Sequence, residues 1–161
     1  MTERGVPRPI PWINKLNLYT HLTDTVELSV LKDIVDAFPA LITLYQTTTN
    51  KTLLAPVNSA ILAIPNFATL LSTADPWLET FARYILLSPR VNYLDFINDT
   101  NYQTSNSSFI TANVNDIGDS YDVVFQDVLD NQASIISRGY ITTTGSHMLV
   151  ISALLIPSSP P

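Results

Sequence analysis

The sequence predicts an α+β fold in which helices come first along the chain and strands follow. In the first half, apolar residues recur every three or four positions, as on helices with one buried face. From about Ser88 they alternate with polar residues, which is typical of strands. With 46% hydrophobic and 14% charged residues, the 161-residue chain has material for one core, and no internal repeat divides it. Helices followed by strands are the order of an α+β domain.

The first predicted helix follows a capping-box signal. Asp24 and Glu27 have the spacing of such a box, and Pro39 limits the helix. The residues before it, up to Pro11, read as a proline-rich arm. The predicted buried positions of this helix are Val30, Leu31, Ile34, Val35 and Phe38.

A strand and a short helix come next. Thr52–Ala55 reads as a buried strand that Pro56 ends, because proline lacks the donor that the next ladder bond needs. Asn58 is the expected cap of a short apolar helix that runs to Pro65.

Two further helices precede the strands. One is expected from Asn66 to Ser72. Asp75-Pro76 predicts the start of the other, because a capping acid is followed by proline at the first helical position. Its predicted buried stripe consists of Leu78, Phe81, Ala82 and Ile85, and Val150, Ile151 and Leu54 are further predicted core residues.

The strand candidates of the second half are separated by polar clusters at Asn98–Ser108 and Asn115–Ser120. They are Phe109–Val114, Tyr121–Val128, Ser134–Arg138, Tyr140–Thr144 and Met148–Ile156.

Three segments together resemble the fasciclin (FAS1) domain family: Thr52–Ile61, the helix segment Phe81–Leu87, and the closing strand Met148–Pro157. The resemblance covers Leu18 to Pro157. It implies a twisted β wedge or sandwich with helices packed at one side. The expected division is an arm over residues 1–17, one domain over 18–157 and a tail over 158–161.

The chain departs from the family pattern at four positions. The family has threonine where Val57 stands, histidine where Ile85 and Leu149 stand, and aspartate where Ser152 stands. The apolar frame is kept and the polar signature is lost.

Charge and composition disfavour two classes of partner, nucleic acid and the membrane interior. A net charge of −6 with eight scattered Lys and Arg residues disfavours nucleic acid, and no basic or long apolar run suggests membrane insertion. There is no cysteine, and the first eleven residues are not a signal peptide. Secretion is expected from the family resemblance, and Asn50, Asn98 and Asn106 begin glycosylation sequons whose number is close to that expected by chance.

The residues suggest neither a metal nor a cofactor. The two histidines, His21 and His147, lack the spacing of a zinc site, and no nucleophile elbow or phosphate loop is present. His21 reads as a solvated or capping group ahead of the first helix. His147 reads as a turn residue or as a group that orients a ligand. Trp77, Tyr93 and Tyr140 are either ordinary core or the wall of an apolar pocket.

The resemblance implies two functions of different kinds. Single fasciclin domains of fungi act as accessory or cofactor-independent proteins in aromatic and polyketide pathways, some beside laccase-type oxidases. The expectation ranked first is therefore binding of an aromatic or polyketide-type molecule, with a cofactor-free cyclisation or coupling step, or help to a partner oxidase. The alternative is an extracellular adhesion module that binds a cell-surface or matrix component.

The ligand site of the first hypothesis is expected where the closing strand meets the helix of Tyr84, because Ile85, Leu149 and Ser152 lie in these two elements. No catalytic residue is assigned. The ligand-binding candidates are His147, Tyr140, Arg138 and Tyr84.

Overall fold

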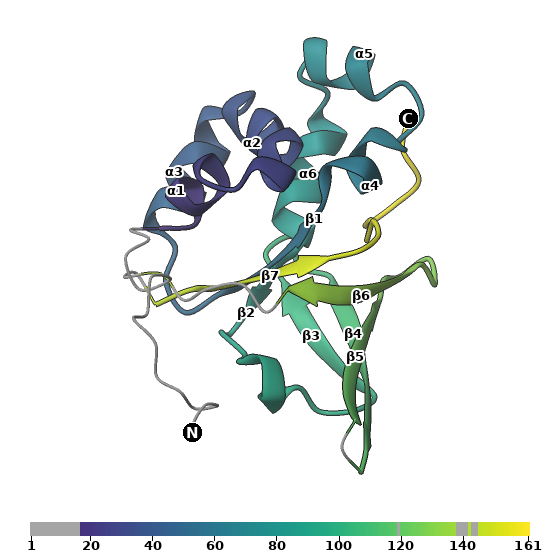
Figure 1. Cartoon of the computed structure of the whole chain (residues 1–161). Helices are drawn as coiled ribbons and strands as arrows, with labels where there is room; N and C mark the ends of the chain where they lie inside the picture. Colours follow the sequence, from purple (N-terminus) through teal and green to yellow (C-terminus); the bar gives the residue numbers. More distant parts are fainter. Residues whose placement is uncertain (1–16, 119, 138–141, 143–144) are drawn as a thin grey trace.

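The α-helices and the strands occupy separate halves of the molecule (Figure 1). The computed structural model describes residues 17–118, 120–137, 142 and 145–161. Its strands form a closed barrel in the order β1-β2-β3-β4-β5-β6-β7. The parallel pair of β1 and β7 closes this barrel, whereas the other neighbours are antiparallel. The strands are β1 (Thr52–Pro56), β2 (Leu86–Ser88), β3 (Thr100–Thr104), β4 (Phe109–Ile117), β5 (Ser120–Gln126), β6 (Gln132–Ser137) and β7 (His147–Ile151).

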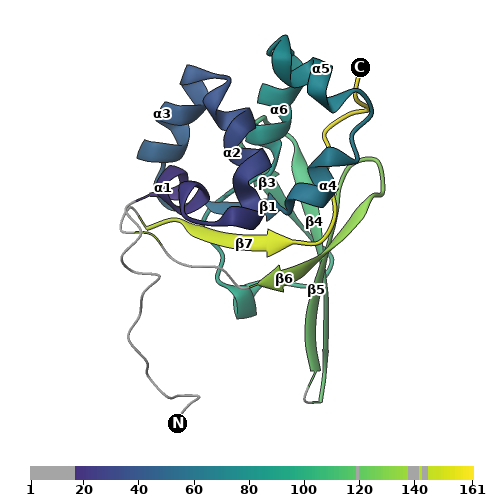
Figure 2. The ribbon, with the colours of Figure 1, turned by 45° about the horizontal axis from the view of Figure 1, so that its top comes forward.

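The α-helices form a layer over one side of the barrel, and β7 runs beneath them (Figure 2). Within this layer α2 contacts α1, α3, α4 and α6. The α+β class and the packing of helices at one side are confirmed. The helical elements are α1 (Leu18–Thr23), η2 (Val26–Leu28), α2 (Ser29–Asp36), α3 (Pro39–Thr47), α4 (Asn58–Leu62), α5 (Phe67–Ser72), α6 (Pro76–Tyr84) and η3 (Tyr93–Asp95).

Local signals explain the starts of α1, α3 and α6. Asp75 caps α6 as predicted, since its Oδ1 accepts a hydrogen bond from the Trp77 backbone N–H at 2.9 Å. Asn17 caps α1 in the same way, through the Thr20 N–H at 2.8 Å. Of the predicted arm, residues 1–16 lie outside the described residues. Pro39 not only limits α2 but also opens α3 at its first position.

The predicted capping box is wrong. Asp24 ends α1 instead of opening the next helix, and α2 begins five residues later at Ser29. The residue before α2, Leu28, has no side chain that can cap. Therefore the first turn of α2 needs a hydrogen-bond acceptor from elsewhere in the fold.

The strand expectations hold for β4, β5 and β6, with small differences at the ends. Two strands were not predicted: β2 is only three residues long, and β3 lies inside the expected separator Asn98–Ser108. The expected strand Tyr140–Thr144 lies outside the described residues, apart from Thr142. The closing strand ends at Ile151 rather than Ile156.

Most of the predicted core is buried. Val35 and the whole α6 stripe are buried, as are Leu31, Ile34, Leu54, Val150 and Ile151. Val30 and Phe38 are only partly buried and pack against this core. Phe38 lies in the turn between α2 and α3 with an extended backbone, so the helical period does not place its side chain.

Candidate functional site

Tyr84 acts as a brace between strands. It is fully buried, its hydroxyl donates to the Phe109 carbonyl oxygen at 2.9 Å, and it accepts from the Val128 N–H at 3.2 Å. Burial raises the pKa of Tyr84 to about 12, so the phenol stays neutral at physiological pH. Its hydroxyl therefore already serves the start of β4 and the turn after β5.

His147 is buried at the first position of β7. Its Nδ1 lies 3.2 Å from the Val91 carbonyl oxygen, and its backbone N–H donates to the Lys51 carbonyl oxygen at 2.8 Å. These partners differ from those of Tyr84. The other two candidates, Arg138 and Tyr140, lie outside the described residues, so the joint ligand role of the four stays a prediction.

The prediction for His21 is wrong. It was expected ahead of the first helix as a solvated or capping group, but it lies in the last turn of α1 and is buried. The helix was missed because Asn17 was not recognised as its cap. The described residues contain no group of three or more His, Cys, Asp or Glu side chains that could hold a metal ion.

The aromatic residues for which the sequence left open core or the wall of an apolar pocket pack in different places. Trp77 stacks on Phe81 with 5.8 Å between ring centroids, and its Nε1 donates to the Ser158 hydroxyl at 3.1 Å. Tyr93 meets Tyr121 edge to face at 5.3 Å. The third, Tyr140, is not described. Trp77 thus fixes the tail that was expected to begin at residue 158.

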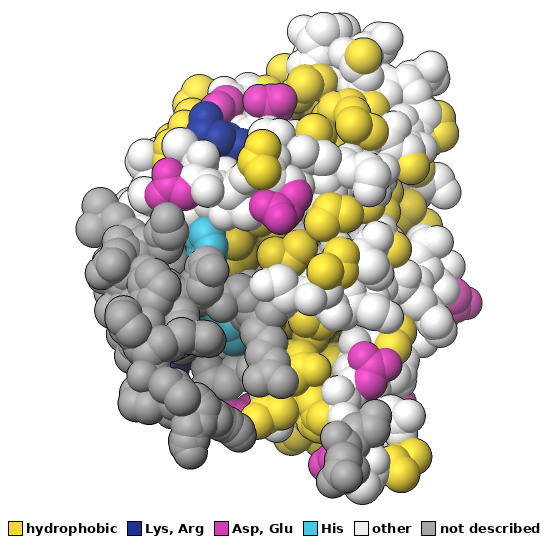
Figure 3. Space-filling view, in the orientation of Figure 1, with side chains coloured by type: hydrophobic (Ala, Val, Ile, Leu, Met, Phe, Trp, Pro, Cys, Tyr) yellow, Lys and Arg dark blue, Asp and Glu magenta, His cyan; other side chains and the backbone are white. Residues whose placement is uncertain are grey.

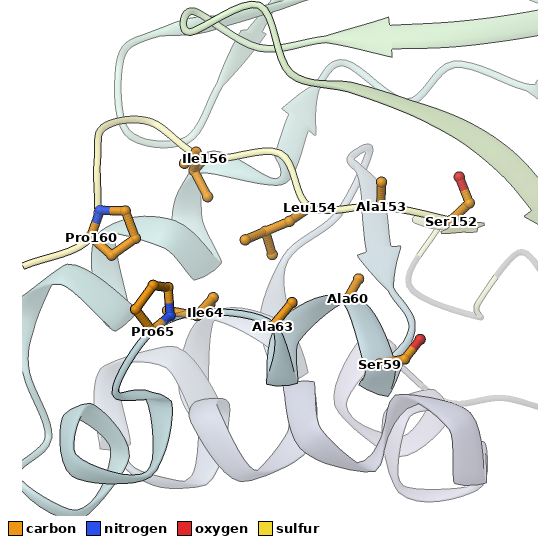
Figure 4. A pocket seen from close by; sticks show the side chains of 10 residues that line it. All are labelled: Ser59, Ala60, Ala63, Ile64, Pro65, Ser152, Ala153, Leu154, Ile156 and Pro160. Carbon is orange, nitrogen blue, oxygen red and sulfur yellow. The ribbon is translucent and has the colours of Figure 1, made fainter.

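An apolar groove lies between α4 and the segment that follows β7. Its volume is about 460 Å³. In Figure 4, Leu154 and Ile156 face the α4 side, whereas Pro65 and Pro160 lie at one end and Ser59 and Ser152 at the other. The lining residues are Ser59, Ala60, Ala63, Ile64, Pro65, Ser152, Ala153, Leu154, Ile156 and Pro160.

Asn58 holds the α4 wall of this groove. Its Oδ1 accepts from the Val30 N–H at 2.8 Å, and its Nδ2 donates to the Val26 carbonyl oxygen at 3.1 Å and to the Ser29 hydroxyl at 3.0 Å. The expectation that Asn58 caps its own helix is therefore wrong. It supplies the acceptor that the first turn of α2 lacks, and it joins α4 to that turn.

Two contacts hold the opposite wall after the strand ends. Ser152 continues the pairing with β6 for one residue, since its N–H donates to the Ser134 carbonyl oxygen at 2.9 Å and its Oγ accepts from the Ser134 N–H at 3.1 Å. Four residues later the Ile156 N–H donates to Asp127 Oδ2 at 2.8 Å. Asp127 therefore directs this segment toward α4 instead of along β6.

Asp127 is buried, and every partner of its carboxylate is a donor. Oδ1 accepts from the backbone N–H groups of Leu129 and Asn131 at 2.8 and 2.9 Å, and Oδ2 also accepts from the Asn131 side chain at 3.0 Å. One carboxylate thus organises the β5–β6 turn and holds the groove wall. Nothing in the local sequence distinguished it from a turn aspartate.

The chemistry of the groove is that of binding. Among the described residues that line it, none has a titratable side chain, and the polar side chains are those of Ser59 and Ser152. Hydrophobic side chains gather on this face where α4 lies over the end of β7 (Figure 3). Of the three departures expected to build a ligand site, Ile85 and Leu149 are fully buried in the core, and Ser152 alone reaches the groove.

A family model and a solved structure both relate this chain to fasciclin domains. The family model described as Fasciclin domain matches residues 26–157. A solved structure of a FAS1 domain pair from the insect cell adhesion molecule Fasciclin I superposes with a TM-score of 0.60 at 20% sequence identity. The match covers 79% of this chain and 44% of that chain, so this chain spans less than half of the pair. The comparison with curated proteins gives no match.

Proposed function

Since the chain belongs to the fasciclin domain family, we propose that it is an extracellular adhesion module that binds a partner protein through the groove of α4 and the C-terminal segment. Fasciclin domains mediate adhesion interactions and are typically extracellular or membrane-associated. Among the helices that the structure describes, none is long and apolar enough to cross a membrane.

The observation that carries the proposal is the open, apolar character of the groove. Leu154 and Ile156 face solvent-accessible space opposite α4, where Leu62 is also exposed. Covering such surface contributes about 25 cal/mol per Å² of apolar area removed from water. A partner that inserts an aliphatic or aromatic side chain gains this energy, and the hydroxyls at one end offer hydrogen bonds to its backbone.

A partner that binds in the groove does not need a charged surface. Although the chain has a net charge of −6, none of the described residues that line the groove is charged. Binding through the groove should therefore change little with salt, because only charge pairs are screened. A partner held by the acidic surface instead would lose affinity steeply as ionic strength rises.

One observation keeps the small-molecule hypothesis as the second candidate. The groove volume lies within the range of roughly 300 to 1,000 Å³ that is common for small-molecule sites. An aromatic or polyketide-type guest would then bind here rather than beside Tyr84 and His147. Because the lining has no titratable group, a cofactor-free reaction there would depend on proximity and desolvation alone.

The test compares two Ala→Glu variants at exposed positions. Ala63 lines the groove directly after the end of α4, whereas Ala68 is exposed on α5 outside the groove. We expect cells to attach to surfaces coated with the wild type or Ala68→Glu, and attachment to Ala63→Glu to fall at least fivefold. Equal attachment of cells to both variants would show that the groove does not take part in adhesion.

Binding of 2-naphthol, an uncharged aromatic probe, tests the second candidate on the same proteins. Under the adhesion proposal, millimolar 2-naphthol moves few amide resonances. Saturable shifts confined to residues 59–65 and 152–156, together with attachment that Ala63→Glu leaves unchanged, would place the small-molecule function first.

A further inference from the structure

The sequons at Asn50, Asn98 and Asn106 all lie away from the groove lining. We propose that Asn98 carries an N-linked glycan. The segment that precedes β3 runs along the end of the barrel opposite to α4 and α5 (Figure 1), so a glycan there leaves the groove open. This inference rests on the extracellular location in the proposed function, since the modification requires the secretory pathway.

The side-chain amide of Asn98 is already oriented for this modification. Asn98 is exposed, and its Oδ1 accepts a hydrogen bond from the Val114 N–H at 2.9 Å. A backbone N–H can only donate, so the atom that faces it must be the amide oxygen. Nδ2 therefore points away from β4, and it makes no hydrogen bond to the residues described. A sugar on Nδ2 leaves the bond to Val114 in place.

The surface around Asn98 is one that a glycan would protect. Ile97 and Leu94 are 64% and 62% exposed, although both are large and apolar. The pairing of β3 with β4 ends at Ala112, so β5 is the one strand that pairs with Val114–Ile117 among the residues described. An exposed strand edge beside apolar side chains favours pairing with other chains. A bulky hydrophilic group at Asn98 would oppose such association.

The other two sequons fit a glycan less well. Asn106 is half-buried, and its Oδ1 is held by the Thr104 hydroxyl. Asn50 is exposed, but its contact with the Arg90 N–H is long at 3.4 Å, and so the amide is held less firmly. The Arg90 side chain also reaches the Gly145 carbonyl oxygen beside this turn, which crowds the space for a sugar.

The transfer requires a lipid-pyrophosphate-linked oligosaccharide as the co-substrate. Asn98 Nδ2 attacks the anomeric carbon, and a carbon–nitrogen bond forms as the bond between that carbon and the pyrophosphate oxygen breaks. The lipid pyrophosphate leaves, and Nδ2 gives up one proton to the transferase. No oxidant or reductant is needed.

The experiment secretes the full chain, with an added leader, from insect cells. Enzymatic release of glycans in H₂¹⁸O converts each occupied Asn to an ¹⁸O-labelled Asp, which peptide mass spectrometry locates. We expect Asn98 to be occupied in more than half of the molecules and Thr100→Val to abolish this. Asn106→Gln, the matched control, should keep it. Thr100→Val retains the Asn98 side chain, so loss of its glycan cannot come from loss of the Val114 bond.

Secreted protein with Asn98 unmodified, or with higher occupancy at Asn106 than at Asn98, would overturn the inference. Its failure is distinguishable from failure of the adhesion proposal. Ala63→Glu should carry the Asn98 glycan at the wild-type level while it loses cell attachment. If Asn98 is unmodified and attachment still depends on Ala63, the adhesion proposal stands without the glycan.

Discussion

Replacing Asn58 with alanine removes the link between α4 and the first turn of α2. The variant loses the Oδ1 acceptor of the Val30 N–H and the Nδ2 donor to the Val26 carbonyl oxygen. A capping bond to a helix N-terminus is worth about 1 kcal/mol, and a further neutral hydrogen bond about 0.5 to 1.5 kcal/mol. Both Nδ2 bonds are exposed, which places the bond to Val26 toward the lower end of this range and makes the bond to the Ser29 hydroxyl a small addition.

These contributions predict that Asn58→Ala lowers the free energy of unfolding by about 1.5 to 2.5 kcal/mol. For a chain of this length the melting temperature should fall by roughly 3 to 10 °C. Asn58→Asp keeps an acceptor opposite Val30 and brings negative charge to a helix N-terminus, but it loses the donor to Val26. Its loss should be about half as large.

Urea unfolding followed by tryptophan fluorescence measures both variants. Asn92→Ala is the matched control, because Asn92 is exposed and makes no side-chain capping bond to η3. It should change stability by less than about 0.5 kcal/mol. Equal stabilities for Asn58→Ala and Asn92→Ala would refute the reasoning. An Asn58→Asp variant as unstable as Asn58→Ala would refute the assignment of Oδ1 as the cap of α2.

Three further predictions concern Tyr84 and Asp127. Tyr84→Phe leaves the backbone groups of Phe109 and Val128 without their partner, and calorimetry should show a loss of about 1 to 3 kcal/mol. Asp127→Ala removes the side-chain acceptor of the Leu129 and Asn131 N–H groups and the anchor of Ile156, so a loss of about 2 to 4 kcal/mol is expected, with faster amide hydrogen exchange in residues 152–156. A variant with wild-type exchange there would contradict the anchor role. The third prediction concerns alkaline pH: burial raises the pKa of Tyr84 to about 12, whereas an unfolded tyrosine titrates near 10, so the unfolded state loses its proton first and stability falls as the pH rises from about 10 to 12. Tyr45, whose pKa burial also raises, adds to this fall, so Tyr84→Phe should make it shallower without abolishing it, and an unchanged slope would argue against Tyr84.

The sequence predicted the elements whose signals are local. The start of α6 followed from Asp75-Pro76, and β1 followed from a short apolar run that a proline ends. The elements it missed owe their form to the rest of the fold. The central residues of β3 alternate in burial, but the strand is polar and marginal alone, and its pairing with β2 and β4 decides its structure.

The groove was not predictable because two tertiary contacts create it. The apolar run from Met148 continues to Ile156, and its composition favours one long strand. The strand stops at Ile151 because β6 ends its pairing near Ser134 and a distant carboxylate, Asp127, takes the Ile156 N–H. The ligand site expected from the departures from the family pattern depended on the same missing information. In the sequence alone, an apolar replacement such as Leu149 can line a dry pocket or lie in the core, and the fold buries it in the core.

The parallel pairing of β1 with β7 has a consequence for the order of events in folding. The two strands are separated by about ninety residues, yet all five residues of β1 have a β7 partner. During synthesis β1 leaves the ribosome long before β7 exists, and its five buried residues must wait with one edge unpaired. Contacts so distant in sequence slow folding and lengthen the time in which an apolar strand can join another chain. The ring can therefore close only after nearly all of the domain has been synthesised, and removal of β7 would leave β1 without that neighbour.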